Sequence, residues 1–219
     1  MYESPYDTYP DRESAGRELA GAVAQLDLAD VVVLALPRGG VPVAYEIATA
    51  LGTPLDVLLV RKVGAPGHRE LGLGAVGEEG VTVLDASLID RLRVDPGAVE
   101  RTASAERIEL ERRASIYRGS RPPIDVAGRD AVIVDDGIAT GGSAAAAVEV
   151  VRRRGARQVV VAVPVAAESG AGRLREVADD VVCPRTVPGS FAVGAWYDDF
   201  HQLDDDEVVE LLTRRDTGG

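Results

Sequence analysis

The chain has 219 residues, a formal net charge of −12 at pH 7 and a single cysteine, Cys183. A chain of this length fits one compact core with a small appended element, and a lone cysteine excludes an intrachain disulfide. Two histidines provide no cluster of zinc-ligand spacing, and the acidity argues against a nucleic-acid partner, which would need clustered positive charge.

The N-terminal stretch, residues 1–14, is polar and lacks the charged-then-apolar pattern of a signal peptide. No apolar run approaches the roughly 18 residues that a membrane span requires. We therefore expect a soluble, cytoplasmic protein with no membrane partner. The basic residues are 23 Arg and one Lys, Lys62. Such an acidic, lysine-poor surface suits high ionic strength, although an Arg-rich genome would give the same bias.

Short apolar runs alternate with Ala-rich segments of helical spacing. The runs have the continuous Val/Leu/Ile character of strands covered on both faces, and they lie at 31–36, 55–60, 131–135, 158–164 and 180–183. The helical segments lie at 41–51, 141–155 and 168–178. This order predicts an α/β fold with an open, mainly parallel twisted sheet, helices on both faces and right-handed crossovers.

Two segments interrupt this alternation. Residues 61–80 are rich in glycine, and they indicate a long mobile loop that leads into a hairpin with 81–85. Residues 97–118 form a charged helix whose neighbouring charges alternate in sign. Residues 204–215 form a last helix with acids at its start and Arg at its end. We expect one domain over 1–219, with a core at about 28–183 and a hood from 184–203 to which the N-terminus contributes.

The stretch "AVIVDDGIATGGS", residues 131–143, carries the strongest functional signal. In an open parallel sheet, ligands bind beyond the carboxyl ends of the strands, where Asp135 and Asp136 stand. The small-residue turn that follows opens a helix, and its free N–H groups can cradle a phosphate. Sugar hydroxyls donate hydrogen bonds to carboxylates, so the stretch is typical of a ribose 5-phosphate clamp.

This stretch resembles the thirteen-residue PRPP-binding signature of the type I phosphoribosyltransferases. The resemblance implies that Asp135 and Asp136 contact the ribose 2- and 3-hydroxyls. It also implies a loop around the 5-phosphate, formed by Ala139, Thr140, Gly141, Gly142 and Ser143. A similar group of predicted phosphoribosyltransferases shares "GAPGHRELGLGAV" and "WYDDFHQL" but has no assigned base specificity.

Two further stretches match the family. "LPRGG" follows the first strand, where the family keeps a pyrophosphate loop that often contains a non-proline cis peptide, so Arg38, Gly39 and Gly40 are implied to bind there. "VRKVGAPG" resembles the opening of the mobile catalytic loop in adenine phosphoribosyltransferases, which implies that Arg61 and Lys62 lie near the leaving pyrophosphate. The loop from Val63 to Ala75 would then close over the site.

The resemblance implies transfer of ribose 5-phosphate from PRPP to a nitrogen acceptor, a nucleobase by preference, with release of pyrophosphate. Mg²⁺ would be held through ligand oxygens and water rather than in a dedicated protein site, with Asp135 and Asp136 as its candidate protein contacts. Two alternatives stay open: a non-catalytic sensor of PRPP or a nucleotide, with 97–118 as its partner surface, and a phosphorylase or hydrolase on the same scaffold.

Aromatic residues cluster near the C-terminus. Phe191, Trp196 and Tyr197 could stack on the acceptor base, or they could pack the C-terminal segment against the sheet. "GLGAVG" at 72–77 has dinucleotide-loop spacing, but no strand precedes it directly and a β-like run follows, so we expect no such site there. The sequence identifies neither the acceptor nor the oligomeric state, and a homo-oligomer is compatible with it.

Overall fold

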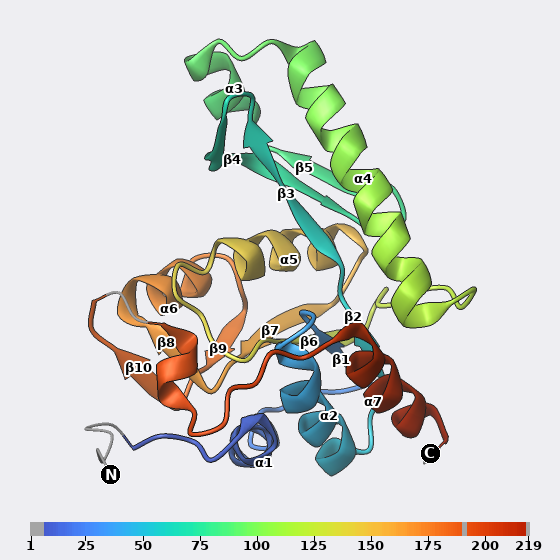
Figure 1. The fold of residues 1–219 in the computed structure, drawn as a ribbon, viewed down its shortest axis with the longest axis vertical. Coiled ribbons are helices and arrows are strands. Elements are labelled where there is room, and N and C mark those ends of the chain that lie inside the picture. The colour runs from blue at the N-terminus through green and yellow to red at the C-terminus, as the bar shows by residue number, and fades with distance from the viewer. Residues whose placement is uncertain (1–6, 190–191, 218–219) are drawn as a thin grey trace.

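A computed structural model describes residues 7–189 and 192–217 of the chain (Figure 1). At its centre is a parallel sheet with the strand order β2-β1-β6-β7-β9. Its strands are β1 (Val31–Ala35), β2 (Leu55–Val57), β6 (Asp130–Val134), β7 (Gln158–Ala162) and β9 (Asp180–Val182). All five coincide with predicted apolar runs, although β2 ends at Val57 and leaves the rest of its run outside the sheet.

Helices cover both faces of this sheet, as the apolar runs predicted. Successive strand residues face opposite layers. On one face Val33 packs with α1 (Arg12–Val23), α2 (Gly40–Leu51) and α7 (Asp205–Thr217). On the other face Val32 packs with α5 (Gly142–Arg153) and α6 (Glu168–Arg175). The predicted α/β fold with an open parallel sheet is therefore confirmed.

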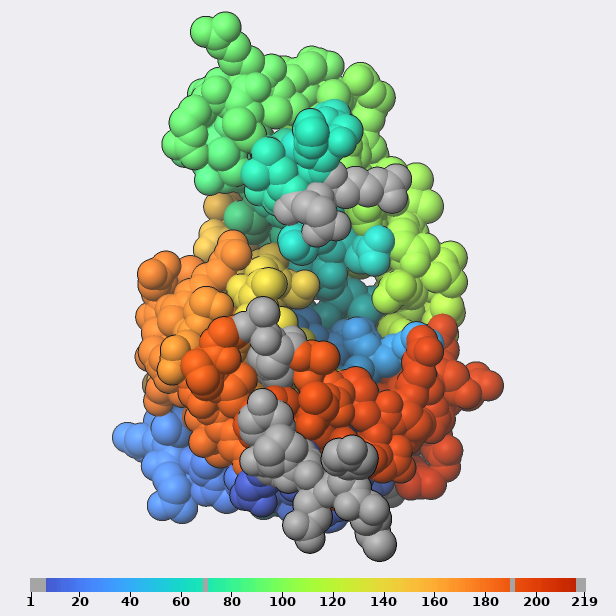
Figure 2. Space-filling model, turned by 60° about the vertical axis from the view of Figure 1, so that its left-hand side comes forward, coloured from blue at the N-terminus to red at the C-terminus, as the bar shows by residue number. Residues whose placement is uncertain are grey.

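A second lobe stands over α5 (Figures 1 and 2). It consists of the antiparallel strands β3 (Val60–Ala65), β4 (His68–Gly77) and β5 (Thr82–Leu84), with α3 (Ala86–Leu92) and α4 (Pro96–Arg118). Figure 2 shows the surface hollowed where this lobe meets the layer below it. The predicted hairpin is present, but most of the segment expected to be a long loop is strand.

The glycines of this segment permit close packing. A Cβ added at Gly77 would lie 2.4 Å from Val150 Cγ1 of α5, which is closer than real Cβ atoms approach. The apolar side chains of Val63, Leu73 and Val76 are fully buried between the lobe and its neighbours. The glycine-rich composition of residues 61–80, which is typical of a loop, therefore reflects strands that must lie close to a helix.

Several elements were not predicted. They are α1, α3, β8 (Val165–Ala167), β10 (Arg185–Val187) and the 3-10 helix η1 (Val193–Trp196). Helix α1 lies so close to α2 that a Cβ at Gly16 would be 2.8 Å from the Val43 carbonyl oxygen. The division into a core at 28–183 and a hood at 184–203 stays a prediction. No helix among the described residues is long and apolar enough to cross a membrane.

Candidate functional site

The loop after β1 and the loop after β6 lie side by side at the carboxyl edge of the sheet. Strands β1 and β6 pair in register from Val31 to Ala35, and Leu36 donates its N–H to the Val134 carbonyl at 2.8 Å. The Pro37–Arg38 peptide is cis, as the family resemblance implied. Added Cβ atoms at Gly39 and Gly40 would lie 2.0 Å from Asp136 Oδ2 and 2.5 Å from Val134 O. Only glycine allows the two loops to approach this closely.

The start of α5 is open to a ligand. Gly141 has a φ of +72° and precedes the helix, and no side chain caps the first turn. A Cβ at Gly141 would lie 3.0 Å from the Gly170 carbonyl oxygen of α6, which supports this turn from behind. Ala139, Thr140 and Ser143 are exposed. The implied phosphate loop therefore has uncapped N–H groups and exposed hydroxyls.

Asp135 faces a cavity of about 240 Å³. The cavity is also lined by Pro37, Arg61, Arg113 and Ser143. Burial raises the pKa of the Asp135 carboxyl well above its usual range, and the neighbouring Asp136 carboxylate raises that pKa further. The backbone N–H of Asp136 donates to Asp135 Oδ1 at 2.9 Å. Asp135 therefore presents a carboxyl group with few protein partners to this cavity.

Asp136 has different surroundings. Arg12 Nε lies 2.9 Å from Asp136 Oδ2, and the side chains of this pair are only 9% and 13% exposed. Arg12 also donates from Nη1 to the His201 carbonyl at 3.0 Å, and its guanidinium lies 3.8 Å from the centroid of the Phe200 ring. Tyr197 donates its hydroxyl to the Asp136 carbonyl at 2.6 Å. The ribose contact implied for Asp136 stays a prediction, because it would have to share this carboxylate with Arg12.

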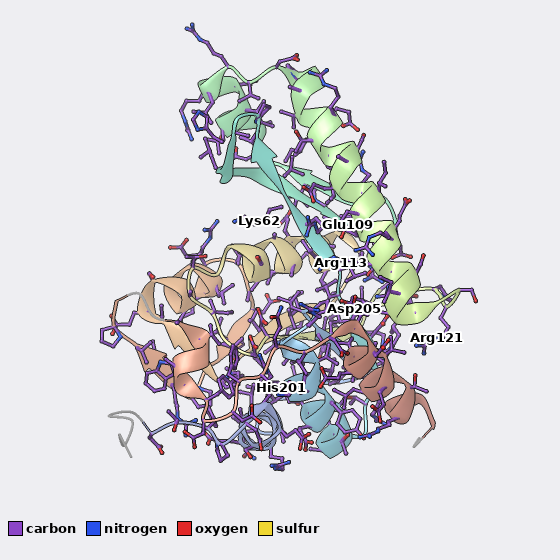
Figure 3. The ribbon with its side chains drawn as sticks, in the orientation of Figure 1. Lys62, Glu109, Arg113, Arg121, His201 and Asp205 are labelled. Atoms are coloured by element: carbon purple, nitrogen blue, oxygen red, sulfur yellow. The ribbon has the colours of Figure 1, made fainter. Side chains whose placement is uncertain are left out.

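Three guanidinium groups surround the Asp135 cavity and the adjacent loop, and each lies near one acid. Arg61 Nε lies 2.7 Å from Glu106 Oε2, and Arg113 Nε lies 3.0 Å from Glu109 Oε1. Arg38 Nη1 lies 4.0 Å from Asp205 Oδ1 at the start of α7. Figure 3 labels Glu109 and Arg113 on α4, with Asp205 below them. The acids come from α4 and α7, so both helices contribute to the charge balance around the site.

Arg12 and Arg113 are site residues that could not be recognised in the sequence. Arg12 lies in a helix that was not predicted, and it is 124 residues away from Asp136 in the chain. Arg113 lies in the charged helix that was expected to be a partner surface only under the sensor alternative. No sequence signal pointed to either residue, because only the tertiary fold brings them to the site.

The aromatic residues suggested for base binding pack against other side chains where they are described, and their contact with a base stays a prediction. Trp196 and Tyr197 are 8% and 6% exposed, and they pack in one cluster with Tyr9. The Tyr197 ring lies 5.7 Å from the Tyr9 ring and 5.1 Å from the Phe200 ring, centroid to centroid. The structure therefore supports the packing alternative for Trp196 and Tyr197. Phe191 lies outside the described residues.

The Mg²⁺ that the family resemblance implies stays a prediction, and the residues lining the Asp135 cavity offer it a carboxyl group. No group of three or more His, Cys, Asp or Glu side chains among the described residues could hold a metal ion. Asp135 Oδ1 accepts one backbone hydrogen bond, and Asp135 is the carboxylate residue that lines this cavity. This donor set matches an ion that keeps most of its ligand oxygens and waters.

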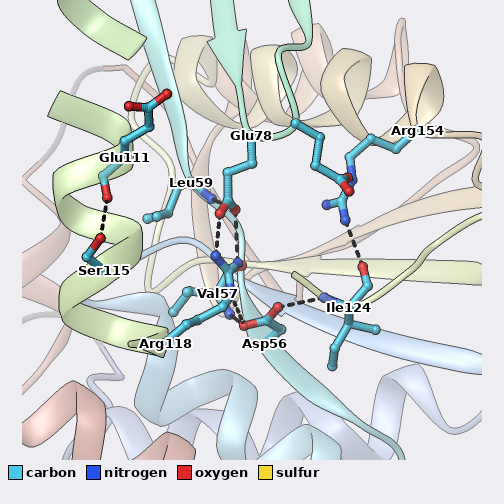
Figure 4. A network of polar contacts seen from close by, with 10 residues as sticks. Asp56, Val57, Leu59, Glu78, Glu111, Ser115, Arg118, Ile124 and Arg154 are labelled. Atoms are coloured by element: carbon cyan, nitrogen blue, oxygen red, sulfur yellow. Dashed lines mark hydrogen bonds and ion pairs between the residues drawn. The ribbon is translucent and has the colours of Figure 1, made fainter. Parts of the chain in front are cut away.

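A buried ion network lies where the chain passes from β2 of the central sheet to β3 of the second lobe (Figure 4). Arg118, at the end of α4, donates from Nε to Asp56 Oδ1 at 2.7 Å and pairs with Glu78. Glu78 in turn accepts the Leu59 N–H at 3.3 Å, and Asp56 accepts the Ile124 N–H at 3.0 Å. The network thus joins the end of β2, the turn after β4 and the end of α4 around the strand that carries Arg61.

Comparisons with known proteins agree with this geometry. The model of the phosphoribosyl transferase domain family matches residues 5–198. A Mycobacterium tuberculosis protein named "Putative phosphoribosyl transferase" is 50% identical over 206 residues, which are 94% of this chain and 46% of that protein. The chain therefore spans about half the length of this relative. The uracil phosphoribosyltransferase of Lacticaseibacillus paracasei is 31% identical over 166 residues, which cover 75% of this chain and 71% of that enzyme.

A solved structure shows the same fold over nearly the whole chain. The crystal structure of TT1426 from Thermus thermophilus has a TM-score of 0.88 and 48% sequence identity, and the match covers 94% of this chain and 98% of that one. Since the family model spans most of the chain and the uracil phosphoribosyltransferase relative is matched over 71% of its length, this protein belongs to the phosphoribosyl transferase domain family.

Proposed function

We propose that the protein transfers ribose 5-phosphate from PRPP to a nitrogen acceptor, a nucleobase, and releases pyrophosphate. The observation that carries the proposal is the cavity beside the α5 start, where Asp135, Ser143 and Arg61 come together next to the cis Pro37–Arg38 peptide. A carboxylate for ribose hydroxyls, an uncapped helix start for one phosphate and a guanidinium for another match the three parts of PRPP. The uracil phosphoribosyltransferase relative supports a nucleobase as the acceptor class.

In the proposed reaction, a ring nitrogen attacks the anomeric carbon of the ribose. The new carbon–nitrogen bond forms as the carbon–oxygen bond to pyrophosphate breaks, and the bonding electrons leave with the pyrophosphate. The nitrogen gives up its proton to water or to the leaving group. Because the transition state spreads positive charge over the ribose and negative charge over the leaving group, the protein contributes positioning and electrostatics rather than a covalent nucleophile.

The residues of the site take separate roles in this proposal. Asp135 orients the ribose, the loop 139–143 binds the 5-phosphate, and Arg38 and Arg61 stabilise the leaving pyrophosphate. Bound Mg²⁺ would neutralise part of the pyrophosphate charge, with Asp135 as its candidate protein contact. It stays a prediction that residues 63–75 close over the site. The cytoplasmic location of the protein also stays a prediction.

The test is Mg²⁺-dependent pyrophosphate release from PRPP, measured with a panel of purine bases, pyrimidine bases and simple amines. We expect release with one acceptor and its loss in Asp135→Asn. Asp90→Asn is the matched control, because Asp90 is an exposed carboxylate of α3 that does not line the cavity. Asp90→Asn should release pyrophosphate at the wild-type rate.

Other outcomes would favour the alternatives. Release that needs no acceptor would indicate hydrolysis. In a separate assay with a nucleoside and inorganic phosphate, formation of ribose 1-phosphate and the free base would indicate a phosphorylase. PRPP binding without release would favour a sensor. A folded protein that binds no PRPP would refute the proposal.

A further inference from the structure

Arg61 and Lys62 are adjacent in β3, and adjacent strand residues point to opposite faces. The structure follows this rule. Arg61 points toward α4, where it pairs with Glu106 and lines the Asp135 cavity. Lys62 points the other way, into a second cavity of about 470 Å³ between β4, α5 and α6. Figure 3 places Lys62 on the side of β3 that faces α5, away from Arg113. The two cations therefore line different cavities on opposite faces of β3.

Lys62 meets a second cation beside the first residue of α5. Its Nζ lies 3.5 Å from the position that a Cβ would take at Gly142, and Arg173 Nη1 of α6 lies 3.8 Å from the same point. Both side chains are exposed, and neither forms an ion pair with any residue that the structure describes. Arg173 was not singled out by the sequence, because its helix carries no recognisable motif.

The acids that line this second cavity have other partners. Glu149 Oε1 lies 3.3 Å from Arg153 Nε on the same helix. Asp85 accepts the Leu88 N–H and the Ser87 hydroxyl, both at 2.8 Å, and so caps α3. Lys62 and Arg173 therefore converge without a counter-charge on a helix start that is itself positive. An anion at this point would relieve the repulsion between them.

We propose that PRPP is bound across β3, with its two charged ends on opposite faces of the strand. Lys62 and Arg173 hold the 5-phosphate at the start of α5, and Arg61 and Arg113 hold the pyrophosphate in the Asp135 cavity. The proposal rests on the proposed function, and it moves Lys62 from the leaving group, where the family resemblance placed it, to the phosphate that stays on the ribose.

The experiment measures the two ends of the substrate separately. Ribose 5-phosphate and inorganic pyrophosphate with Mg²⁺ are titrated by calorimetry into wild-type protein and into Lys62→Met, Arg173→Met, Arg61→Met and Arg113→Met. Lys62→Met and Arg173→Met should each weaken ribose 5-phosphate binding by about tenfold or more and leave pyrophosphate binding within about twofold. Arg61→Met and Arg113→Met should show the reverse pattern.

Arg175→Met is the matched control, because it removes the same charge from an exposed position of the same helix as Arg173. It should change neither titration. Since the four tested side chains are not fully buried, all variants should keep the wild-type circular dichroism spectrum.

Three results would overturn the inference. If Lys62→Met weakens pyrophosphate binding and leaves ribose 5-phosphate binding unchanged, both Arg61 and Lys62 bind the leaving group. The proposed function then stands, but the assignment of the two ends of PRPP to opposite faces of β3 is wrong. If Arg175→Met weakens ribose 5-phosphate binding as much as Arg173→Met, only the net charge of α6 matters. If the wild-type protein binds neither ligand, the proposed function fails together with this assignment.

Discussion

Asp135 and Asp136 carry the same side chain at neighbouring positions, yet their charges are balanced differently. Arg12 pairs with Asp136 in a setting that is largely shielded from water. Asp135 receives one backbone hydrogen bond, and burial together with the Asp136 charge raises its pKa. In the protein without ligand, ionisation of Asp135 therefore lowers the stability of the fold. Such a cost is typical of a side chain whose position serves ligand binding.

We predict that Asp135→Asn stabilises the free protein at pH 8. A carboxyl whose pKa is raised on folding costs stability as the pH rises from its unfolded pKa, about 4, through its folded pKa. Asn keeps an acceptor oxygen for the Asp136 N–H but cannot ionise. Each kcal/mol of relieved repulsion should raise the melting temperature, Tm, by about 2–4 °C in a domain of this size.

The measurement is Tm by calorimetry for both proteins between pH 4 and pH 8. The difference should be near zero at pH 4 and grow with pH. Asp90→Asn should show no such trend. A difference that is constant with pH would mean that the substitution acts through packing rather than through charge.

At the scale of elements, the buried Arg118 network ties the second lobe to the sheet. Arg118, Asp56 and Glu78 are each about 6% exposed, and the network holds two carboxylates against one guanidinium. Buried charges of this kind contribute specificity of arrangement more surely than stability, but they are costly when one partner is removed.

We predict that Arg118→Met destabilises the protein by about 3–5 kcal/mol, because it leaves the two buried carboxylates without a cation. The free energy of unfolding in urea measures the effect. Arg112→Met is the control on the same helix, since Arg112 pairs with Glu109 at the surface. Its unfolding midpoint should stay at the wild-type value. Equal midpoints for the two variants would show that the network is not needed to hold the lobe.

The sheet could be predicted from the sequence because its strands are covered on both faces, and they therefore appear as unbroken apolar runs. The lobe could not be predicted in the same way. Its β4 strand places Gly77 against Val150, and a strand built around such contacts has the composition of a loop. Helix α1 was missed because Gly16 and its small neighbours replace the large apolar residues that mark a helical face.

Some residues of the candidate site could be located from the sequence, and others could not. The signature placed Asp135 and the α5 start correctly with respect to the sheet, because strand ends and glycine turns are local features. Arg12, Arg113 and Arg173 come from three separate helices, and only tertiary packing brings them near the two loops. The sequence could also not show that Arg61 and Lys62 diverge, since that depends on whether 60–65 is a strand or a loop.

At the scale of the whole molecule, the chain has a net charge of −12, yet several cationic side chains lie around the candidate site. Arg38, Arg61, Lys62, Arg113 and Arg173 all lie around the carboxyl edge of the sheet or the start of α5. Excess negative charge elsewhere destabilises the compact state through self-repulsion. Exposed pairs such as Arg153 with Glu149 offset little of this repulsion, because surface ion pairs contribute weakly.

We predict that salt stabilises the protein at pH 7.5. Raising NaCl from 0.1 M to 1 M shortens the Debye length from about 10 Å to about 3 Å, which screens the long-range repulsion more than it weakens contacts at hydrogen-bond distance. Tm should therefore rise with NaCl at pH 7.5 and change little at pH 5, close to the isoelectric point of about 4.7, where the net charge nearly vanishes. A Tm that falls with NaCl at pH 7.5 would show that local ion pairs outweigh the net charge, and an equal rise at both pH values would show that salt acts through hydrophobic burial instead.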